Sequence, residues 1–158
     1  MDNIDQFYQK YVDQIYNYCF YRVGNHFIAQ DLTSETFLKF MQSKWQKMTN
    51  PVAYLYAICR NLIIDHYRKH ESHNLSLEDL IKQGAEFGFE TDSEQKLVLA
   101  QVLTEVNQLS EDQKEVLLLQ YVQDLDNATI ALTLDKSEAA VKSLAFRGLE
   151  TLRKKLNQ

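Results

Sequence analysis

Glycine and proline are scarce in this sequence, which contains four glycines and one proline among 158 residues. Proteins built from many short strands need frequent tight turns, and tight turns depend heavily on these two residues. The scarcity therefore argues against a β architecture. Apolar residues instead recur at intervals of three and four, which is the period of an amphipathic helix. The sequence predicts an all-α fold.

Cysteine is also rare, and the two cysteines, Cys19 and Cys59, lie inside apolar helical patterns. Neither belongs to a CxxC pair, and neither has a histidine at the spacing of a metal ligand. The pattern indicates two buried, reduced thiols, and a redox-sensing pair is the alternative.

Histidines offer one arrangement that resembles a metal site. His66, His70 and His73 are spaced by four and three residues, so a helix can bring them to one face. No cysteine or carboxylate cluster completes the ligand set, and a solvated helix end explains the same pattern. We therefore predict no metal and no other cofactor.

Long apolar runs are missing as well. The most apolar stretch, residues 53–64, is too short to span a bilayer and contains Arg60. The chain begins MDNID, which is acidic where a secretory signal peptide is basic. We expect a cytoplasmic protein that does not insert into a membrane.

Acidic residues predominate, with a formal net charge of -5, but the charge is unevenly distributed. Residues 1–73 hold eight basic and seven acidic side chains, and residues 74–92 hold one and five. Residues 93–158 hold eight and ten, yet the last 22 residues hold five basic side chains against two acidic ones. Because local potential governs contact with phosphates, the overall acidity does not exclude nucleic-acid binding.

By length alone the chain forms one domain or two small helical ones, and the family motifs described at the end of this subsection favour two, joined by an acidic linker. We place the domains at residues 1–70 and 93–158, and the linker at residues 71–92. The linker is either a flexible tether or, through its short apolar motif LSLEDLI, a docking segment.

The first domain is predicted to contain three helices. They are expected at residues 4–23, 28–41 and 51–69. Gly24 and Asn25 end the first helix, and Pro51 occupies a favoured first-turn position of the third.

The second helix carries Asp31 and Glu35 four residues apart, which places both carboxylates on one face. The apolar spacing turns Leu32 and Leu38 toward the core. An acid/base pair, a solvated face and a partner surface are the three interpretations of the carboxylates.

The loop before the third helix combines positive charge, a flat ring and an amide group, in Lys44, Trp45, Lys47 and Asn50. Proteins bind unpaired strands by stacking bases on aromatic rings and placing cations near the phosphates. The loop therefore suggests a site for single-stranded nucleic acid. A buried structural role for Trp45 is the alternative.

The C-terminal part predicts a helix-turn-helix. A helix over residues 111–122, capped by Ser110, precedes a short helix with the sequence NATIALTL. Asp135 and Lys136 separate it from a longer helix with a positive end, for which Ser137 is the N-cap. This pattern places the second helix of the motif in the major groove of DNA.

Two blocks of the sequence resemble a known family. Residues 31–69, with DLTSETFLKFM followed by NPVAYLYAICRNLIIDHYRK, resemble region 2 of bacterial RNA polymerase sigma factors of the extracytoplasmic-function group. Residues 109–156, from LSEDQKEVLLLQY to FRGLETLRKKL, resemble region 4 of the same family. The resemblance covers nearly the whole chain apart from the middle linker.

The resemblance implies a surface for the RNA polymerase core on the second helix. Sigma factors grip the clamp helices of the largest polymerase subunit there, and the matching positions are Asp31, Ser34, Glu35 and Leu38. Ser34 stands where glutamine is usual in the family.

The resemblance also implies contacts with the minus-ten promoter element, whose bases the family captures as the duplex opens. The matching positions are Lys44, Trp45, Lys47, Asn50, Tyr54, Arg60 and Asn61. Val52 and Ala57 stand where arginine is frequent, which implies fewer phosphate contacts.

For the minus-thirty-five element, the resemblance implies the start of the last helix, with Lys142, Ser143, Phe146 and Arg147 as the DNA-contacting residues. Family members commonly carry basic or polar residues where this chain has Leu144, Phe146, Leu149, Glu150 and Thr151. Either DNA binding there is weak or altered, or the face binds a protein such as an anti-sigma factor.

The sequence thus predicts a sigma factor that brings RNA polymerase core to promoter DNA, assists its opening and has no active site of its own. The resemblance adds an anti-sigma factor as a regulatory partner. The alternative is a helix-turn-helix regulator that acts without core polymerase. A helical nucleotide-processing enzyme needs a glycine-rich phosphate loop or a paired-carboxylate metal motif, and the sequence has neither.

Overall fold

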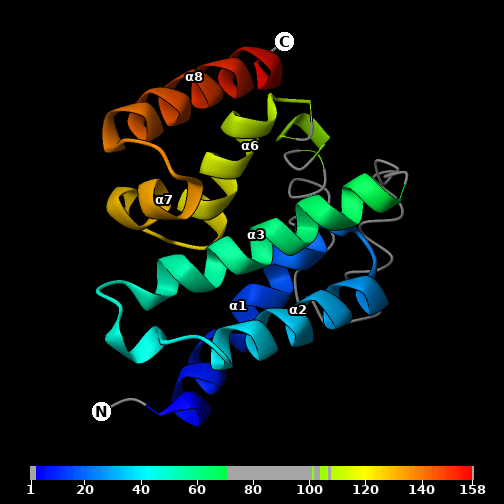
Figure 1. The fold of residues 1–158 in the computed structure, drawn as a ribbon. Helices are drawn as coiled ribbons and strands as arrows, with labels where there is room; N and C mark the ends of the chain where they lie inside the picture. The colour runs from blue at the N-terminus through cyan, green and yellow to red at the C-terminus, as the bar shows by residue number, and fades with distance from the viewer. Residues whose placement is uncertain (1–2, 71–100, 102–103, 107, 158) are drawn as a thin grey trace.

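The structure is a computed structural model, and it describes residues 3–70, 101, 104–106 and 108–157. These residues form helices and no strand, so the all-α prediction is confirmed. They build an N-terminal bundle and a C-terminal group of helices that lies along one side of it (Figure 1). The acidic linker predicted at residues 71–92 lies outside the described residues, and the predicted domain boundaries stay predictions.

Three α-helices form the N-terminal bundle: α1 (Ile4–Val23), α2 (His26–Met41) and α3 (Pro51–Lys69). The bounds of α1 and α3 agree with the prediction because local signals fix the ends of both helices. Asn3 and Gln6 form a reciprocal capping box at the start of α1. Gly24 ends α1 with φ 68°, a left-handed conformation that carries no steric cost for glycine.

Asparagine side chains begin the other two helices of the bundle. Asn25 accepts a hydrogen bond from the N–H of Ile28 at 3.0 Å, and α2 therefore starts two residues earlier than predicted. Asn50 accepts from the N–H of Ala53 at 3.1 Å and begins α3. A short 3-10 helix, η1 (Trp45–Lys47), lies in the loop between α2 and α3.

The core of the N-terminal bundle is aromatic. Phe7, Phe40 and Trp45 are buried, with ring centroids 4.8 to 5.2 Å apart. Tyr18 and Tyr56 are fully buried and meet edge to face at 5.7 Å. Such ring contacts contribute beyond the burial of apolar area. They fix α1, α2 and α3 relative to one another.

The C-terminal group contains α6 (Glu111–Leu117), the π-helix η2 (Leu118–Val122), α7 (Asn127–Leu134) and α8 (Glu138–Leu156). The prediction of one α-helix over residues 111–122 is wrong in its second half. The N–H of Gln123 bonds to the carbonyl of Leu118, five residues back, which widens the helix. Asp124 then adopts φ 57°, and the chain turns toward α7.

The predicted helix-turn-helix is confirmed as α7 and α8. Asp135 forms the turn at φ 55° and ψ 50°, a left-handed conformation that aspartate tolerates better than most residues. Ser137 caps α8 by accepting from the N–H of Ala140 at 3.1 Å. Gly148 lets α8 approach α6 closely, because a Cβ added there would lie 2.8 Å from Cδ1 of Leu117.

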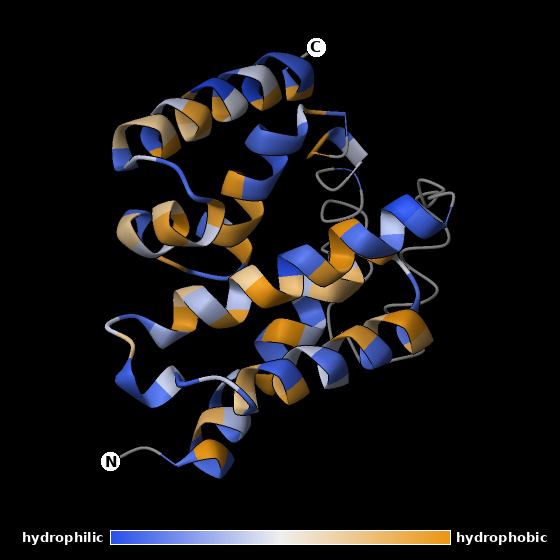
Figure 2. Cartoon of the chain, in the orientation of Figure 1, coloured by the Kyte–Doolittle hydropathy of each residue, from blue (hydrophilic) through white to orange (hydrophobic). Residues whose placement is uncertain are grey.

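The two groups of helices share α3. α1 and α2 pack against α3 within the bundle, and α7 packs against it from the C-terminal group (Figure 1). The buried apolar residues of both groups form one cluster. Hydrophilic residues gather at the C-terminal end of α3 (Figure 2). Because α1 and α2 pack on one side of α3 and α7 on another, α3 lies between the bundle and the helix-turn-helix.

Candidate nucleic-acid and protein interface

The four residues predicted to contact core polymerase lie together on the exposed side of α2. Asp31, Ser34, Glu35 and Leu38 are all exposed. Leu38 is 56% exposed, so the expectation that it faces the core is wrong. It follows Asp31 by seven residues, two helical turns, which returns it to the same side of the helix.

Two apolar residues outside the predicted contact set extend this surface. Phe27 is 71% exposed and Met41 is 52% exposed. Positions 27, 31, 34, 38 and 41 alternate by four and three, and this spacing is the signal that could have revealed them. We call the set the α2 stripe; it consists of Phe27, Asp31, Ser34, Glu35, Leu38 and Met41. Its chemistry suits a basic partner with an apolar centre.

The loop between α2 and α3 exposes its lysines and buries its tryptophan. Lys44 and Lys47 are exposed, whereas Trp45 is 7% exposed. The Trp45 ring stacks on Phe40 and tilts against Phe7. The Trp45 ring is therefore buried in the core, as the alternative interpretation expects, and its contact with a minus-ten base stays a prediction.

On α3, Tyr54 and Asn61 occupy the exposed side. They are seven residues apart, so they lie two turns apart on one face, and both are exposed. The Tyr54 ring, 37% exposed, lies 6.2 Å from Phe40, which in turn stacks on Trp45. An accessible ring next to the lysine-bearing loop is thus provided by Tyr54.

Asn50 and Arg60, the remaining minus-ten candidates, are only half-buried. The Asn50 side-chain amide donates to the hydroxyl of Thr129 on α7 at 3.0 Å, while its oxygen caps α3. The Nε atom of Arg60 is buried and has no hydrogen-bond partner among the described residues. The structure therefore divides the predicted minus-ten set between solvent, core and the helix-turn-helix.

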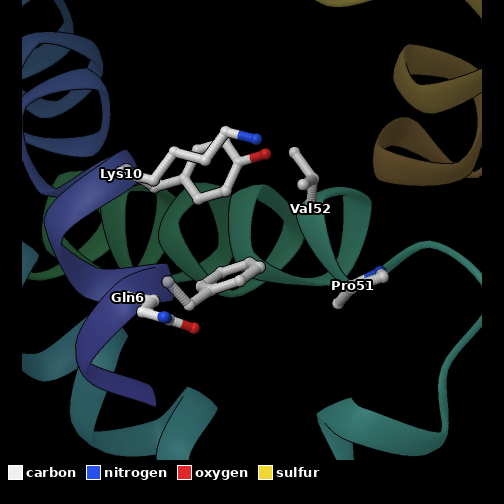
Figure 3. Close-up of a pocket in the computed structure, with 6 residues that line it drawn as sticks. Gln6, Lys10, Pro51 and Val52 are labelled. Atoms are coloured by element: carbon white, nitrogen blue, oxygen red, sulfur yellow. The ribbon is translucent and has the colours of Figure 1, made fainter. Parts of the chain in front are cut away.

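A cavity of about 240 Å³ opens beside this loop, between α1 and the start of α3 (Figure 3). Its lining residues are Gln6, Phe7, Lys10, Tyr11, Pro51 and Val52. The Lys10 ammonium lies 5.4 Å from the centroid of the Tyr11 ring. Sequence reasoning missed this cavity because its two walls come from helices about 40 residues apart in the chain.

The first three turns of α8 present three of the four predicted minus-thirty-five residues to solvent. Lys142, Phe146 and Arg147 are exposed, with Phe146 64% exposed, and Ser143 is half-buried. Leu144, which the sequence places near this face, is half-buried and packs against the core. The accessible side of α8 over residues 142–147 therefore combines two cations with one ring.

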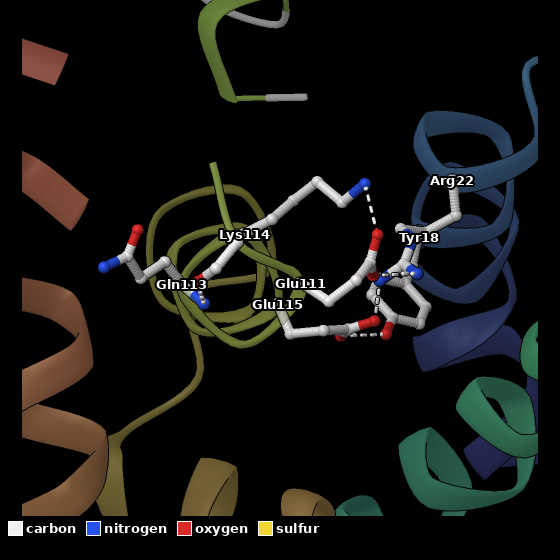
Figure 4. Close-up of polar contacts among 7 residues, drawn as sticks. Tyr18, Arg22, Glu111, Gln113, Lys114 and Glu115 are labelled. Atoms are coloured by element: carbon white, nitrogen blue, oxygen red, sulfur yellow. Dashed lines mark hydrogen bonds and ion pairs between the residues drawn. The ribbon is translucent and has the colours of Figure 1, made fainter. Parts of the chain in front are cut away.

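A buried polar network joins α1 to α6 (Figure 4). The Arg22 guanidinium forms ion pairs with Glu115 and, at 3.0 Å, with Glu111. The Tyr18 hydroxyl donates to the carboxylate of Glu115 at 2.5 Å. The side chains of Arg22 and Glu115 are 4% and 3% exposed. Their charges are therefore compensated within the protein rather than by water.

The network also sets the protonation of its members. Burial raises the pKa of Tyr18, so its hydroxyl keeps its proton and acts as a donor. At Glu111, partial burial opposes ionisation, but the hydrogen bond from Lys114 and the charge of Arg22 outweigh it and lower the pKa of this carboxyl. Sequence reasoning missed the network. Its signal is Arg22 itself, a charge on the apolar stripe of α1.

Residues 3–70, 101, 104–106 and 108–157 hold no group of three His, Cys, Asp or Glu side chains that could bind a metal ion. The His66 and His70 rings stack at 4.6 Å, and His73 lies outside the described residues. No helix in the described part of the chain is long and apolar enough to cross a membrane.

Comparison with known families matches both halves of the chain. The family model for sigma-70 region 2 matches residues 7–73, and the model for sigma-70 region 4 matches residues 99–152. The chain belongs to the sigma-70 family. In this sigma factor, region 2 corresponds to α1, α2 and α3, and region 4 contains the helix-turn-helix.

Curated relatives place this sigma factor in the extracytoplasmic-function group. It is 34% identical to the ECF RNA polymerase sigma factor BldN of Streptomyces coelicolor over 96% of its own length and 59% of that relative. It is 27% identical to the ECF RNA polymerase sigma factor SigM of Bacillus subtilis over 98% of its length and 96% of that relative. The sigma factor thus spans about three fifths of one relative and nearly all of the other.

A solved structure shares the fold of this sigma factor. It is the sigma factor RpoE in complex with the anti-sigma factor NepR from Bartonella quintana. The TM-score is 0.72 at 19% identity, and the match covers 97% of this chain and 96% of RpoE. The likeness extends over both helical groups.

Proposed function

We propose that this sigma factor binds RNA polymerase core, directs it to specific promoters and assists the opening of the duplex. The observation that carries the proposal is that one chain holds both region 2 and region 4, with candidate contact faces exposed on α2, α3 and α8. The sigma factor supplies recognition and binding energy, and the polymerase supplies catalysis. The sigma factor has no active site of its own and acts in the cytoplasm.

The α2 stripe is the proposed surface for core polymerase. Its apolar members, Phe27, Leu38 and Met41, lose water when a partner helix covers them. The carboxylates of Asp31 and Glu35 lie beside them and select a basic partner through complementary charge. Apolar contacts then supply affinity, and the carboxylates supply orientation and rate of association.

The exposed side of α3 and the neighbouring loop are the proposed surface for the unpaired strand. Tyr54 offers a ring for stacking, Asn61 offers an amide, and the loop lysines attract phosphates. A surface that binds splayed bases stabilises the opened duplex by differential affinity, without covalent chemistry. Trp45 contributes by supporting the Phe40 ring against which Tyr54 lies.

Region 4 is proposed to contact the minus-thirty-five element weakly. Lys142 and Arg147 are placed for phosphates, and the Phe146 ring suits a thymine methyl group in the major groove. RpoE was solved with an anti-sigma factor, and we include a protein of that kind among the partners of this chain. The exposed Phe146 is a place where such a protein can bind.

The proposal is tested by transcription in vitro with purified core polymerase and a library of genomic fragments. We expect transcripts that start at defined promoters only when the sigma factor is added. A second lane contains the chain with Asp31→Lys and Glu35→Lys, which should give these transcripts at a clearly lower level. Absence of any chain-dependent transcript would overturn the proposal.

The same material separates the alternative, a regulator that acts without core polymerase. A sigma factor comigrates with core polymerase in gel filtration and directs initiation itself. A regulator binds duplex promoter DNA alone and changes transcription only when another sigma factor is present. Specific duplex binding by the free chain, together with no comigration, favours the regulator.

A further inference from the structure

The cavity between α1 and the start of α3 has no part in the proposed core-polymerase and promoter surfaces. Its volume is about 240 Å³, slightly below the range of about 300–1,000 Å³ that is usual for drug-sized ligands. Gln6 and Lys10 lie on its α1 side, and Pro51 and Val52 lie on its α3 side (Figure 3). The cavity therefore suits one small ligand held between the two helices.

The walls of the cavity are aromatic and apolar. The buried Phe7 ring lies against the half-buried Tyr11 ring, with centroids 4.7 Å apart and planes tilted by 44°. Pro51 and Val52, both half-buried, complete the wall from α3. Aromatic rings bind other flat rings by offset stacking or edge-to-face contact. These walls therefore favour a ligand with a planar ring.

The polar groups at the cavity offer hydrogen-bond donors. The Oε1 atom of Gln6 accepts from the N–H of Asn3 at 3.3 Å, so the NH₂ group of this amide is left to donate. The Lys10 ammonium carries three donors, and it lies 5.4 Å from the centroid of the Tyr11 ring. Within the described residues, neither this ammonium nor the Tyr11 hydroxyl has a hydrogen-bond or ion-pair partner. Both groups are therefore available to a ligand.

The charge of the cavity is positive although the protein is acidic. No carboxylate lines the cavity in the part of the chain that the structure describes, whereas the whole sequence has a formal net charge of -5. A hydrogen bond from an ammonium to an anion is roughly twice as strong as one between neutral groups. The donors and the charge therefore favour a ligand with an anionic group.

We propose that this cavity binds a small ligand in which a planar ring carries an anionic group, with the ring against Phe7 and Tyr11 and the anion on Lys10. A nucleotide has this chemistry, because its base is planar and its phosphate is anionic. The ligand is either a free nucleoside monophosphate or one nucleotide of a single strand, since the loop proposed for the unpaired strand ends beside Pro51. Only the second source rests on the proposed function.

The test titrates adenosine monophosphate into the isotope-labelled full chain and follows the amide shifts by NMR. We expect saturable shifts at Phe7, Lys10, Tyr11 and Val52, and at the indole N–H of Trp45, whose ring lies 5.2 Å from that of Phe7. A ligand of this size in a partly open site should have a Kd on the order of 0.1–1 mM. Adenosine alone and inorganic phosphate alone should each bind at least about tenfold more weakly, because each lacks one of the two groups.

Three variants locate the ligand. Lys10→Gln removes the charge and should weaken binding of adenosine monophosphate by about tenfold while leaving the affinity for adenosine unchanged. Tyr11→Phe removes only the hydroxyl and should weaken binding of the nucleotide by about threefold. Lys39→Gln removes an exposed cation of α2 that does not line the cavity, and this matched control should bind as the unmodified chain does. The amide shifts of each variant without ligand show whether its fold is kept.

The outcomes decide both the site and its ligand. Shifts that do not saturate, or equal losses in Lys10→Gln and Lys39→Gln, refute the site. Equal affinities for adenosine and its monophosphate refute the anionic group, and equal affinities for phosphate and the monophosphate refute the ring.

A short single-stranded oligonucleotide then distinguishes the two sources of the ligand. If it displaces adenosine monophosphate and shifts the same amides, a nucleotide of the strand occupies the cavity. If it displaces nothing, the ligand is a free small molecule, and the site is supported in both cases. None of these measurements uses core polymerase, so failure of transcription overturns the proposed function and leaves the binding result standing.

Discussion

The two helical groups use aromatic residues in opposite ways. In the N-terminal bundle, Phe7, Phe40 and Trp45 are buried against one another. In the C-terminal group, the aromatic residues of the described helices are Tyr121 and Phe146, and they are 62% and 64% exposed. The first group is therefore stabilised by rings, whereas the second has an aliphatic core and offers its rings to partners. Loss of a buried ring of the bundle should therefore cost stability, whereas loss of the exposed Phe146 ring should cost binding.

The largest expected effect is on stability in the bundle. Trp45→Ala removes a ring packed against both Phe7 and Phe40, and such a truncation typically costs ~3–5 kcal/mol of unfolding free energy. Phe146→Ala, the matched control, should change the unfolding free energy by less than ~0.5 kcal/mol because its ring is exposed. Urea denaturation followed by circular dichroism measures both. Similar losses in the two variants would contradict the comparison.

Only the features of the fold that depend on local signals could be predicted from the sequence. The bounds of α1 and α3 follow from local signals, such as Gly24 and Pro51, that act within one helical turn. The π-helix that begins at Leu118 has no such signal in the amino-acid pattern that we used, and the prediction continued the α-helix through it. The burial of Trp45 could not be predicted either. A tryptophan in a basic loop gives the same sequence pattern whether its ring lies in solvent or in a core.

The next effect concerns the charges between the groups. Glu115→Ala leaves Arg22 buried without its closest carboxylate and removes the acceptor of Tyr18, a change that should cost about 3 kcal/mol of unfolding free energy. Glu111→Ala is the control on the same helix. Its side chain is 68% exposed, and exposed ion pairs contribute only about 0–1 kcal/mol. Urea denaturation measures the unfolding free energy of both variants. Equal losses would contradict the conclusion that Glu115 is a buried carboxylate paired with Arg22.

The contacts of Arg22 belong to the part of the site that could not be predicted from the sequence. The positions of Asp31, Ser34 and Glu35 on one face follow from helical spacing alone, and the structure places them so. The partners of Arg22 lie on α6, with Glu111 89 residues further along the chain. Spacing rules do not extend over such a distance. The covering of Asn50 by Thr129 depends on the same packing.

A moderate effect is expected where region 2 meets core polymerase. Asp31→Lys with Glu35→Lys should weaken comigration with core polymerase, because each reversed contact at an interface rim costs ~1 kcal/mol or more in binding. The helical circular dichroism should not change, since both side chains are exposed. Asp13→Lys on α1, also exposed, is a control that changes the net charge in the same direction by half as much. If that control reduces binding as strongly, the α2 stripe is not the contact surface.

The smallest expected effect concerns DNA binding by region 4. Its accessible cations near the start of α8 are Lys142 and Arg147. Each phosphate neutralised contributes about 0.9 to the slope of log affinity against log salt, so a slope of only about 2 is expected for the full chain on duplex DNA. Lys142→Ala and Arg147→Ala should each lower this slope by about one unit if both contact the backbone.

Lys155 supplies the matched control on the same helix. Its ammonium already contacts Gln108 at 3.2 Å and Glu105 at 3.9 Å, near the far end of α8. Lys155→Ala should therefore leave the salt dependence unchanged. A slope well above 2, with equal losses in all three variants, would mean that the whole of α8 follows the DNA backbone. Phe146 would then lie against DNA, and region 4, like region 2, would use a ring at its nucleic-acid surface.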